Sequence, residues 1–281
     1  MKKFLQALSF VMMLFVMTSC SSKNTNSDNS NKASSTNKEN LAQENEKEGY
    51  LTISAAASLT DALNDVIIEF FNEYPEISIN ANFASSGAIQ TQIEEGAPVD
   101  IFLSASTKQI DSLKEQDLLD NDSIYNLLEN EVVLVTPKDS DLQIESFEDL
   151  ANSSDIDKGE IAIGEVGSVP VGEYTKEIYE NLGLWDKIEP NANWAKDVRE
   201  VLDWVTQGEV KAGIVYKTDA ILEKDNLNII ASAPEGSHNK VIYPMAIVKK
   251  SDNKDNARLF EEFLKKDQAK KIFNSYGFKV K

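Results

Sequence analysis

The chain has 281 residues, 41% of them hydrophobic, and carries a formal net charge of −19. So acidic a protein repels nucleic acid and anionic lipid, which excludes both as ligands of its surface. Its one cysteine, Cys20, excludes a disulfide within the chain and a metal site built from several cysteines.

The first nineteen residues have the pattern of a secretory signal peptide. Two lysines precede an apolar run from Phe4 to Met17, which is shorter than the roughly 20 residues of a membrane span. The run ends at Met17-Thr18-Ser19-Cys20, which resembles the bacterial lipobox with Met in place of the usual Leu. We therefore predict that residues 1–19 are removed and that Cys20 is lipidated, which anchors the protein on the extracytoplasmic face of the cell membrane.

The segment that follows Cys20 has almost no apolar residues. Residues 20–49 consist mainly of Ser, Asn, Lys and Glu, a composition that buries too little apolar surface to offset the entropy lost on ordering. We predict a disordered tether here. Residues 50–281 are then enough for one large or two modest domains.

Beyond the tether, short apolar strands alternate with amphipathic helices. Leu51–Ile53 predicts a strand that precedes a helix from Leu59 to Pro75, and Ile77–Phe83 predicts a strand that precedes a helix from Gly87 to Gly96. Further strands are predicted at Val99–Leu103, Val132–Val135, Ile161–Ile163, Gly213–Val215, Leu227–Ile230 and Tyr243–Val248. Further helices are predicted around Ile110–Leu113, Tyr174–Leu182, Val198–Val205 and Ala257–Phe273. This alternation predicts an α/β fold with mostly parallel sheets and a ligand at the carboxyl ends of the strands.

Four loops of small residues run directly into predicted helices. They are Ala56-Ala57-Ser58, Ala84-Ser85-Ser86-Gly87, Val169-Pro170-Val171-Gly172 and Ala195-Lys196-Asp197-Val198. Each junction has backbone N–H groups without an intrahelical partner at the positive end of a helix. Several such ends at one point would hold an anion without Lys or Arg, and distant surface carboxylates would be screened beyond about 10 Å. The pattern favours a receptor for a small oxyanion.

Five segments carry a family resemblance. They are Ala55–Thr60, Phe83–Gly87, Gly96–Ala105, Val169–Tyr174 and Gly213–Tyr216. In order and spacing they resemble the periplasmic molybdate-binding proteins of ABC importers. The resemblance implies a type II periplasmic-binding-protein fold, in which two α/β lobes joined by two crossing segments close on a ligand.

The same resemblance implies where the lobes divide. We expect residues 50–131 and 242–281 to form the first lobe and residues 132–241 the second. The crossings are expected near Glu131–Val135 and Ile242–Val248.

The resemblance also implies a ligand site. Its five positions fall on Ser58, Ser86, Val171, Val198 and Tyr216. The two serines can each offer a hydroxyl and a backbone N–H, the two valines only a backbone N–H, and the tyrosine a phenolic O–H. Val171 stands where relatives often have Ala, which leaves the N–H available but changes the size of the pocket.

The resemblance further implies a function. The protein would capture molybdate, and also tungstate, and deliver it to an ABC permease with a cytoplasmic ATPase. It would act as a monomer, without catalysis, without a cofactor, and without a metal cation, because molybdenum binds through the oxygens of its oxyanion.

Two alternatives remain at the level of sequence. A receptor for sulfate or another oxyanion is one, because a pocket of donors suits any fully ionised dianion, whereas hydrogen phosphate would need an acceptor. An extracytoplasmic hydrolase that uses Ser58 or Ser86 is the other, but the only histidine, His238, lies in a polar loop and no Ser-x-x-Lys string contains either serine.

Two further motifs are incomplete. A dinucleotide loop at Gly164–Gly167 lacks its third glycine, and a calcium loop at Asp120 fails because Ile124 takes a ligand position.

Overall fold

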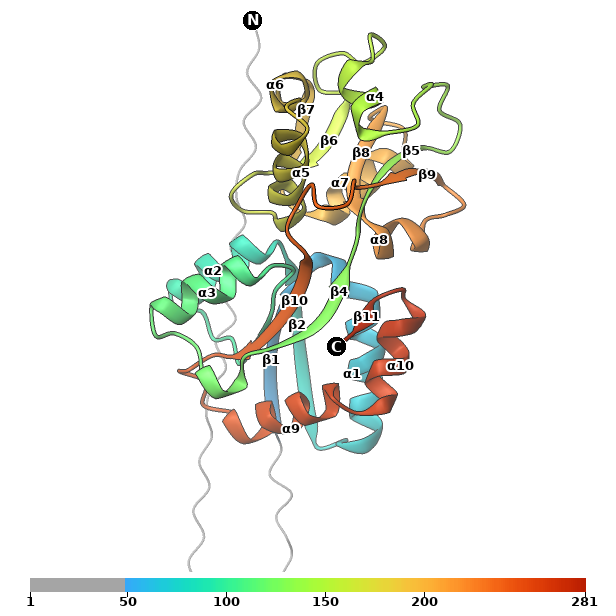
Figure 1. Ribbon diagram of the computed structural model, residues 1–281. Coiled ribbons are helices and arrows are strands. Elements are labelled where there is room, and N and C mark those ends of the chain that lie inside the picture. The colour runs from blue at the N-terminus through green and yellow to red at the C-terminus, as the bar shows by residue number, and fades with distance from the viewer. Residues whose placement is uncertain (1–48) are drawn as a thin grey trace, which may run out of the picture. The chain divides into compact units, whose positions relative to one another are not determined.

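The structure is a computed structural model that describes residues 49–281. The predicted signal peptide, Cys20 and nearly all of the predicted tether lie outside the described residues. Within residues 49–281, no helix has both the length and the apolar content that a membrane crossing requires. Figure 1 shows that this part of the chain folds into two α/β lobes, each built around its own sheet.

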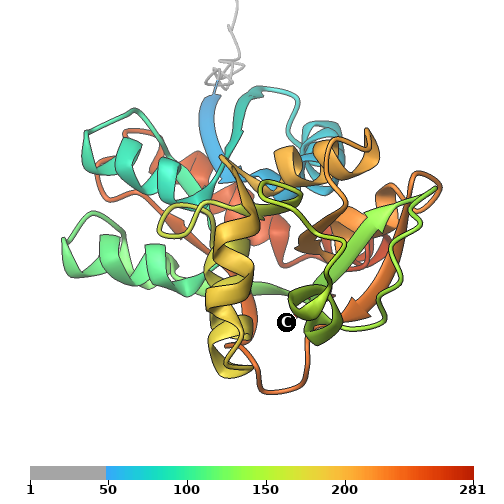
Figure 2. The same ribbon diagram turned by 90° about the horizontal axis from the view of Figure 1, so that it is seen from above.

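The first lobe has a six-stranded sheet in the order β11-β4-β10-β3-β1-β2. Its strands are β1 (Gly49–Ala56), β2 (Ile77–Ala84), β3 (Ile101–Leu103), β4 (Tyr125–Asn130), β10 (Val241–Ile247) and β11 (Lys279–Val280). Its helices are η1 (Ala57–Leu59), α1 (Thr60–Glu73), α2 (Ser86–Glu94), α3 (Thr107–Glu115), η2 (Asn121–Ser123), α9 (Lys254–Leu264) and α10 (Asp267–Ser275), where η marks a short 3-10 helix. The parallel strands β1 and β2 lie side by side, in blue and teal in Figure 2.

The second lobe has a five-stranded sheet in the order β7-β6-β8-β5-β9. Its strands are β5 (Val132–Pro137), β6 (Ile161–Gly164), β7 (Ala192–Ala195), β8 (Ala212–Tyr216) and β9 (Leu227–Ser232). Its helices are α4 (Phe147–Asn152), α5 (Pro170–Asn181), α6 (Trp185–Ile188), η3 (Glu189–Asn191), α7 (Val198–Thr206) and α8 (Lys217–Leu222).

Both sheets are mixed, so the expectation of mostly parallel sheets is wrong. Strand β1 pairs in parallel with β2 and β3, and β6 pairs in parallel with β7 and β8. All antiparallel pairs involve β4, β5, β9, β10 or β11. Four of these strands flank the points where the chain changes lobe, so no helical crossover returns the chain to the same sheet and enforces a parallel pair.

The chain passes between the two sheets at Glu131 and again at residues 233–240. The second passage precedes the expected Ile242–Val248, because the apolar run that starts at Val241 is β10, a full member of the first sheet. Residues 233–240 contain Pro234 and a glycine, Gly236, with a φ of 75°, and neither favours a continuous strand.

Helix α1 illustrates how the sequence specifies the packing in the first lobe. Its apolar positions recur at helical spacing, so that Leu63, Val66 and Phe70 are all fully buried. The ring of Phe70 packs edge-on against Phe260 of α9, with ring centroids 5.0 Å apart. The helix ends just before Pro75, which disfavours a helical conformation at the preceding residue. Packing of this kind fixes the start of α1, and with it η1, at the edge of the lobe that faces the second lobe.

Candidate anion-binding site

A small cavity lies between the two lobes. Its volume is about 10 Å³, measured as the space open to the centre of a water-sized sphere. Pockets for drug-sized ligands have about 300–1,000 Å³, so this cavity is far too small for such a ligand. Its lining residues are Ala56, Ala57, Ser58, Ala84, Ser85, Ser86, Ala105, Val169, Pro170, Val171, Asp197, Val198 and Tyr216.

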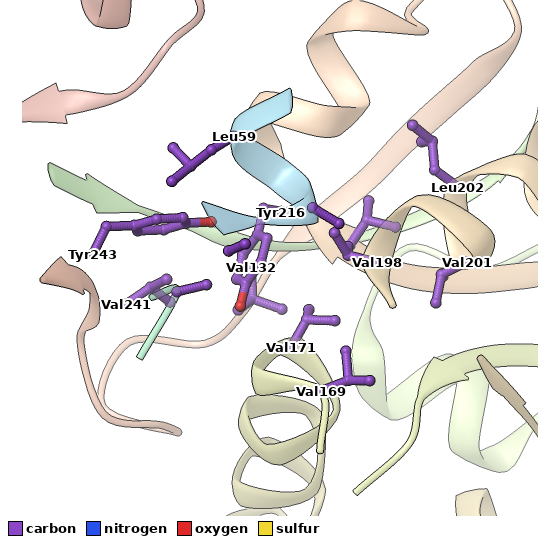
Figure 3. Packing of buried hydrophobic residues seen from close by; sticks show 14 of the residues in the cluster. Leu59, Val132, Val169, Val171, Val198, Val201, Leu202, Tyr216, Val241 and Tyr243 are labelled. Atoms are coloured by element: carbon purple, nitrogen blue, oxygen red, sulfur yellow. The ribbon is translucent and has the colours of Figure 1, made fainter. Parts of the chain in front are cut away.

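All five residues that the resemblance implies as ligand positions line this one cavity. Each is at most 4% exposed, although they come from η1, α2, α5, α7 and β8. Figure 3 shows Val171, Val198 and Tyr216 close together, each on a different element. The structure therefore brings together residues that are separated by up to 158 positions, from Ser58 to Tyr216, in the sequence.

Three helices begin at the cavity. Ser86 is the first residue of α2, Val198 the first of α7, and Val171 the second of α5. The first N–H groups of a helix have no acceptor within it and carry the positive end of the helix dipole. Since the side chains of Val171 and Val198 are apolar, these two positions can contribute only their backbone N–H groups to a ligand.

The serines of the site do not cap these helices. The side chain that caps α2 is Ser85, whose Oγ accepts a hydrogen bond from the Ala88 N–H at 3.3 Å, and no side chain caps η1 or α1. Helix α7 is capped by Asp197, whose carboxylate accepts from the Glu200 N–H at 3.0 Å. The hydroxyls of Ser58 and Ser86 are therefore not used by the helix starts.

Ser86 and Tyr216 both have a hydroxyl proton to offer. The Ser86 Oγ accepts a hydrogen bond from the Ala105 N–H at 2.9 Å, which leaves its proton for another acceptor. The Tyr216 hydroxyl is buried and has no hydrogen-bond partner among residues 49–281. An unpaired buried hydroxyl costs about 1–3 kcal/mol, a cost that an acceptor in the cavity would remove. Burial raises the pKa of Tyr216 well above its usual value, so the phenol keeps its proton.

Contacts between the lobes enclose the cavity. The Gly87 N–H of the first lobe donates to the Ser168 carbonyl of the second at 2.9 Å. The Lys108 Nζ lies 3.0 Å from a carboxylate oxygen of Glu173 on α5. The Arg199 guanidinium on α7 donates to the Asp61 carboxylate on α1 at 2.6 Å. These contacts hold the lobes in a closed arrangement around the cavity.

Charged side chains are nearly absent from the lining. Among the lining residues only Asp197 is charged, and its carboxylate is engaged as the cap of α7. Arg199, next to Val198, turns away toward Asp61 and toward Asp219 of α8, whose Oδ1 lies 2.8 Å from its Nε. That short contact lacks hydrogen-bond geometry, and both Asp219 oxygens are buried without a hydrogen bond in the described part of the chain. The site thus relies on neutral donors.

The buried Asp219 carboxyl predicts a pH-dependent stability. Burial raises its pKa to about 7, although the Arg199 guanidinium acts to lower it. The folded protein therefore keeps a proton that the unfolded chain loses near its usual pKa of about 4. This contribution to stability is complete below about pH 4 and is lost as the pH rises through about 7.

We expect the Asp219→Asn variant to lose this part of the pH dependence. The free energy of unfolding of the variant minus that of the unmodified protein should be larger at about pH 8 than at about pH 5, because only the unmodified protein loses stability over this range. Urea denaturation at the two pH values measures the difference. Asp203→Asn makes the same replacement on the exposed face of α7 and is the control. A relative stability of Asp219→Asn that is the same at both pH values, or that changes only as the control does, would contradict the prediction.

The remaining candidates of the sequence analysis lie elsewhere. His238 is not among the cavity-lining residues, and its Nδ1 is 2.5 Å from the carbonyl oxygen of Asn239. None of the three serines that line the cavity therefore has a histidine base beside it. Sequence reasoning missed Tyr243, whose hydroxyl oxygen lies 2.8 Å from the Ser58 Oγ. The only signal for it in the sequence is a polar hydroxyl within an otherwise apolar strand.

Comparisons with known proteins identify the family. The profile of the bacterial extracellular solute-binding protein family matches residues 51–279. YvgL of Bacillus subtilis (strain 168) is 42% identical over 236 residues, which cover 84% of this chain and 88% of YvgL. The molybdate-binding protein ModA of Escherichia coli (strain K12) is 39% identical over 235 residues, which cover 83% of this chain and 90% of ModA.

A solved structure supports the fold. The periplasmic molybdate-binding protein of Azotobacter vinelandii matches with a TM-score of 0.72 at 22% identity, over 81% of this chain and 98% of that one. This likeness confirms the type II periplasmic-binding-protein fold, and the matches in sequence confirm the resemblance to the molybdate-binding proteins of ABC importers. The chain belongs to the bacterial extracellular solute-binding proteins.

Proposed function

We propose that this protein captures molybdate, and also tungstate, outside the cytoplasm and delivers it to an ABC permease with a cytoplasmic ATPase. The observation that carries the proposal is the cavity between the lobes, where the hydroxyls of Ser58, Ser86 and Tyr216 and three helix starts meet with no cationic side chain in the lining. Closure of the two lobes on the anion would be the signal that the permease recognises.

The donor set favours a fully ionised dianion. Molybdate, tungstate and sulfate only accept hydrogen bonds near neutral pH, whereas hydrogen phosphate also carries a proton that needs an acceptor. The one carboxylate in the lining, that of Asp197, already accepts from the Glu200 N–H. Between molybdate and sulfate, the name of the relative ModA favours molybdate, since that protein is described as molybdate-binding.

Isothermal calorimetry against four anions tests the proposal. We expect tight binding of molybdate and tungstate, weak binding of sulfate and no heat with phosphate, because the pocket supplies donors and the relative ModA is described as molybdate-binding. Heat with sulfate alone would replace molybdate by sulfate as the ligand. Turnover of an ester substrate, abolished by Ser58→Ala or Ser86→Ala, would favour the hydrolase instead.

A pair of substitutions tests whether side chain and main chain contribute as proposed. Ser86→Ala should weaken molybdate binding by about 1–3 kcal/mol, because one donor to a charged acceptor is lost. Val171→Ala is the matched control, because it shortens a buried side chain of the same cavity but keeps the backbone N–H. It should cost much less affinity in the same titration. A loss at Val171→Ala as large as that at Ser86→Ala would argue against main-chain recognition.

The proposal includes the way the receptor is held. Cys20 would carry the lipid anchor and residues 21–49 would form the tether, both outside the described residues apart from Gly49. The folded part would act as a monomer without a cofactor. Anchoring of this kind would keep the receptor near its permease on the extracytoplasmic face of the membrane.

A further inference from the structure

The Ser58 hydroxyl has a neighbour that decides what it can offer to a ligand. Its Oγ lies 2.8 Å from the hydroxyl oxygen of Tyr243, and both side chains are almost fully buried. From this distance alone, either oxygen could donate. If Ser58 donates to Tyr243, it has only lone pairs left for the cavity, and if Tyr243 donates to Ser58, the Ser58 proton is free to point into the cavity.

The Asn130 amide settles the direction, because its own orientation is fixed. The Asn130 Oδ1 accepts a hydrogen bond from the Glu131 N–H at 2.9 Å, so this atom is the amide oxygen. The Nδ2 then faces the Thr218 Oγ1 at 2.8 Å and the Tyr243 hydroxyl oxygen at 3.2 Å. An amide nitrogen donates two protons and accepts none. The Tyr243 oxygen is therefore an acceptor toward Asn130.

The rest of the chain of hydrogen bonds follows from counting protons. Among residues 49–281, the Tyr243 hydroxyl has two hydrogen-bond partners, Asn130 and Ser58. Since it accepts from Asn130, its single proton goes to the Ser58 Oγ. Burial raises the pKa of Tyr243 well above its usual value, which keeps that proton in place. The Ser58 oxygen then accepts from Tyr243, and its own proton is left for the cavity.

We propose that Asn130 and Tyr243 form a relay of hydrogen bonds that fixes the Ser58 hydroxyl as a donor toward the bound anion. They are positioning residues, because they act through Ser58 and do not line the cavity. The inference rests on the proposed function and deepens it. With Ser86 held as an acceptor by the Ala105 N–H, both serine hydroxyls present protons, and so the site selects ligands that bring only lone pairs.

A double-mutant cycle tests the relay. In Asn130→Asp, a carboxylate accepts where the amide donated, so Tyr243 turns its proton to residue 130 and Ser58 donates to Tyr243. Ser58 then has no proton for the anion, and molybdate binding should weaken about 10-fold or more. Tyr243→Phe removes the hydrogen bond to Ser58 but leaves the Ser58 proton free to rotate, so molybdate affinity should fall by about threefold.

The diagnostic quantity is the coupling between the two substitutions. In the Tyr243→Phe background the direction of the relay no longer matters. Adding Asn130→Asp should then weaken molybdate binding by about twofold or less, through its added charge alone. The background thus serves as the control for that charge. Calorimetry with sodium molybdate on the full chain in detergent measures the four affinities, and thermal unfolding confirms that each variant is folded.

A second measurement has an outcome that a merely structural role would not produce. In Asn130→Asp the Ser58 lone pairs face the cavity and can accept a hydrogen bond from hydrogen phosphate. The ratio of the affinity for molybdate to the affinity for phosphate should therefore fall. The relay would be overturned if Asn130→Asp weakened molybdate binding equally with and without Tyr243→Phe. It would also be overturned if Asn130→Asp weakened the binding of all anions by the same factor.

The outcome for the unmodified protein separates the two proposals. If it binds molybdate and the cycle shows no coupling, only the relay fails. If it binds sulfate and not molybdate, the assignment of molybdate fails, and the cycle run with sulfate still decides the relay. If it binds none of the anions, both proposals fail.

Discussion

The Gly87→Ala variant should lose about 100-fold in anion affinity, because the added methyl group keeps the lobes apart. A Cβ at residue 87 would lie 2.5 Å from the Ser168 carbonyl oxygen and 2.7 Å from the Ser168 Cα. Both atoms belong to the backbone of the second lobe, so no side-chain rotation can relieve the clash. Calorimetry with molybdate measures the loss.

The same variant should be at least as stable as the unmodified protein when no ligand is present. Residue 87 is the second residue of α2, and Ala is favoured over Gly within a helix by about 0.5–1 kcal/mol. Thermal unfolding of the ligand-free protein should therefore show an unchanged or higher midpoint. Thr91→Ala, one turn further along α2 on its exposed face, is the control that leaves affinity intact. Normal affinity in Gly87→Ala would mean that the lobes close on the anion without this contact.

The Gly172→Ala variant should instead unfold more easily, by about 3 kcal/mol. A Cβ at residue 172 would lie 1.9 Å from the Gly164 carbonyl oxygen and 2.6 Å from the Gly164 carbonyl carbon. Helix α5 and strand β6 belong to the same lobe, so parting of the lobes cannot relieve this clash. Urea denaturation in the absence of ligand measures the loss of stability.

A matched substitution checks that the loss comes from this close approach. Gly183 has a φ of 69°, and a Cβ at this residue would have no neighbouring atom within 4 Å. Because Asn tolerates that backbone conformation, Gly183→Asn should cost about 1 kcal/mol or less. Equal losses in Gly172→Ala and Gly183→Asn would contradict the packing argument. Together, the substitutions at Gly87 and Gly172 separate the closure of the lobes from the folding of one lobe.

The sequence predicts those features that depend on neighbouring residues. The apolar spacing of α1 and the loops of small residues before α2, α5 and α7 are local patterns, and each corresponds to an element of the structure. The helix starts are placed to within a few residues, because caps such as Asp197 lie beside the residues they serve. Family resemblance supplied the five expected ligand positions, and the structure gathers all five residues at one cavity.

Features that depend on distant partners could not be predicted in this way. The strand Tyr125–Asn130 was not expected, because its only buried residues are the adjacent Leu127 and Leu128 and its place beside β10 is visible only in the folded sheet. The partners of Arg199 are 138 residues before it and 20 residues after it, and nothing in either segment marks the pairing. The same holds for Tyr243, which lies 185 residues from Ser58.

Residues of both lobes line the cavity, and this determines how a bound anion can be released. Each lobe supplies only part of the donor set, and among the lining residues no side chain carries a positive charge. A transporter that pries the lobes apart would therefore leave the oxyanion half-coordinated, and incoming water could replace the missing donors at once. Release would need mechanical separation alone, with no competing ion and no protonation step.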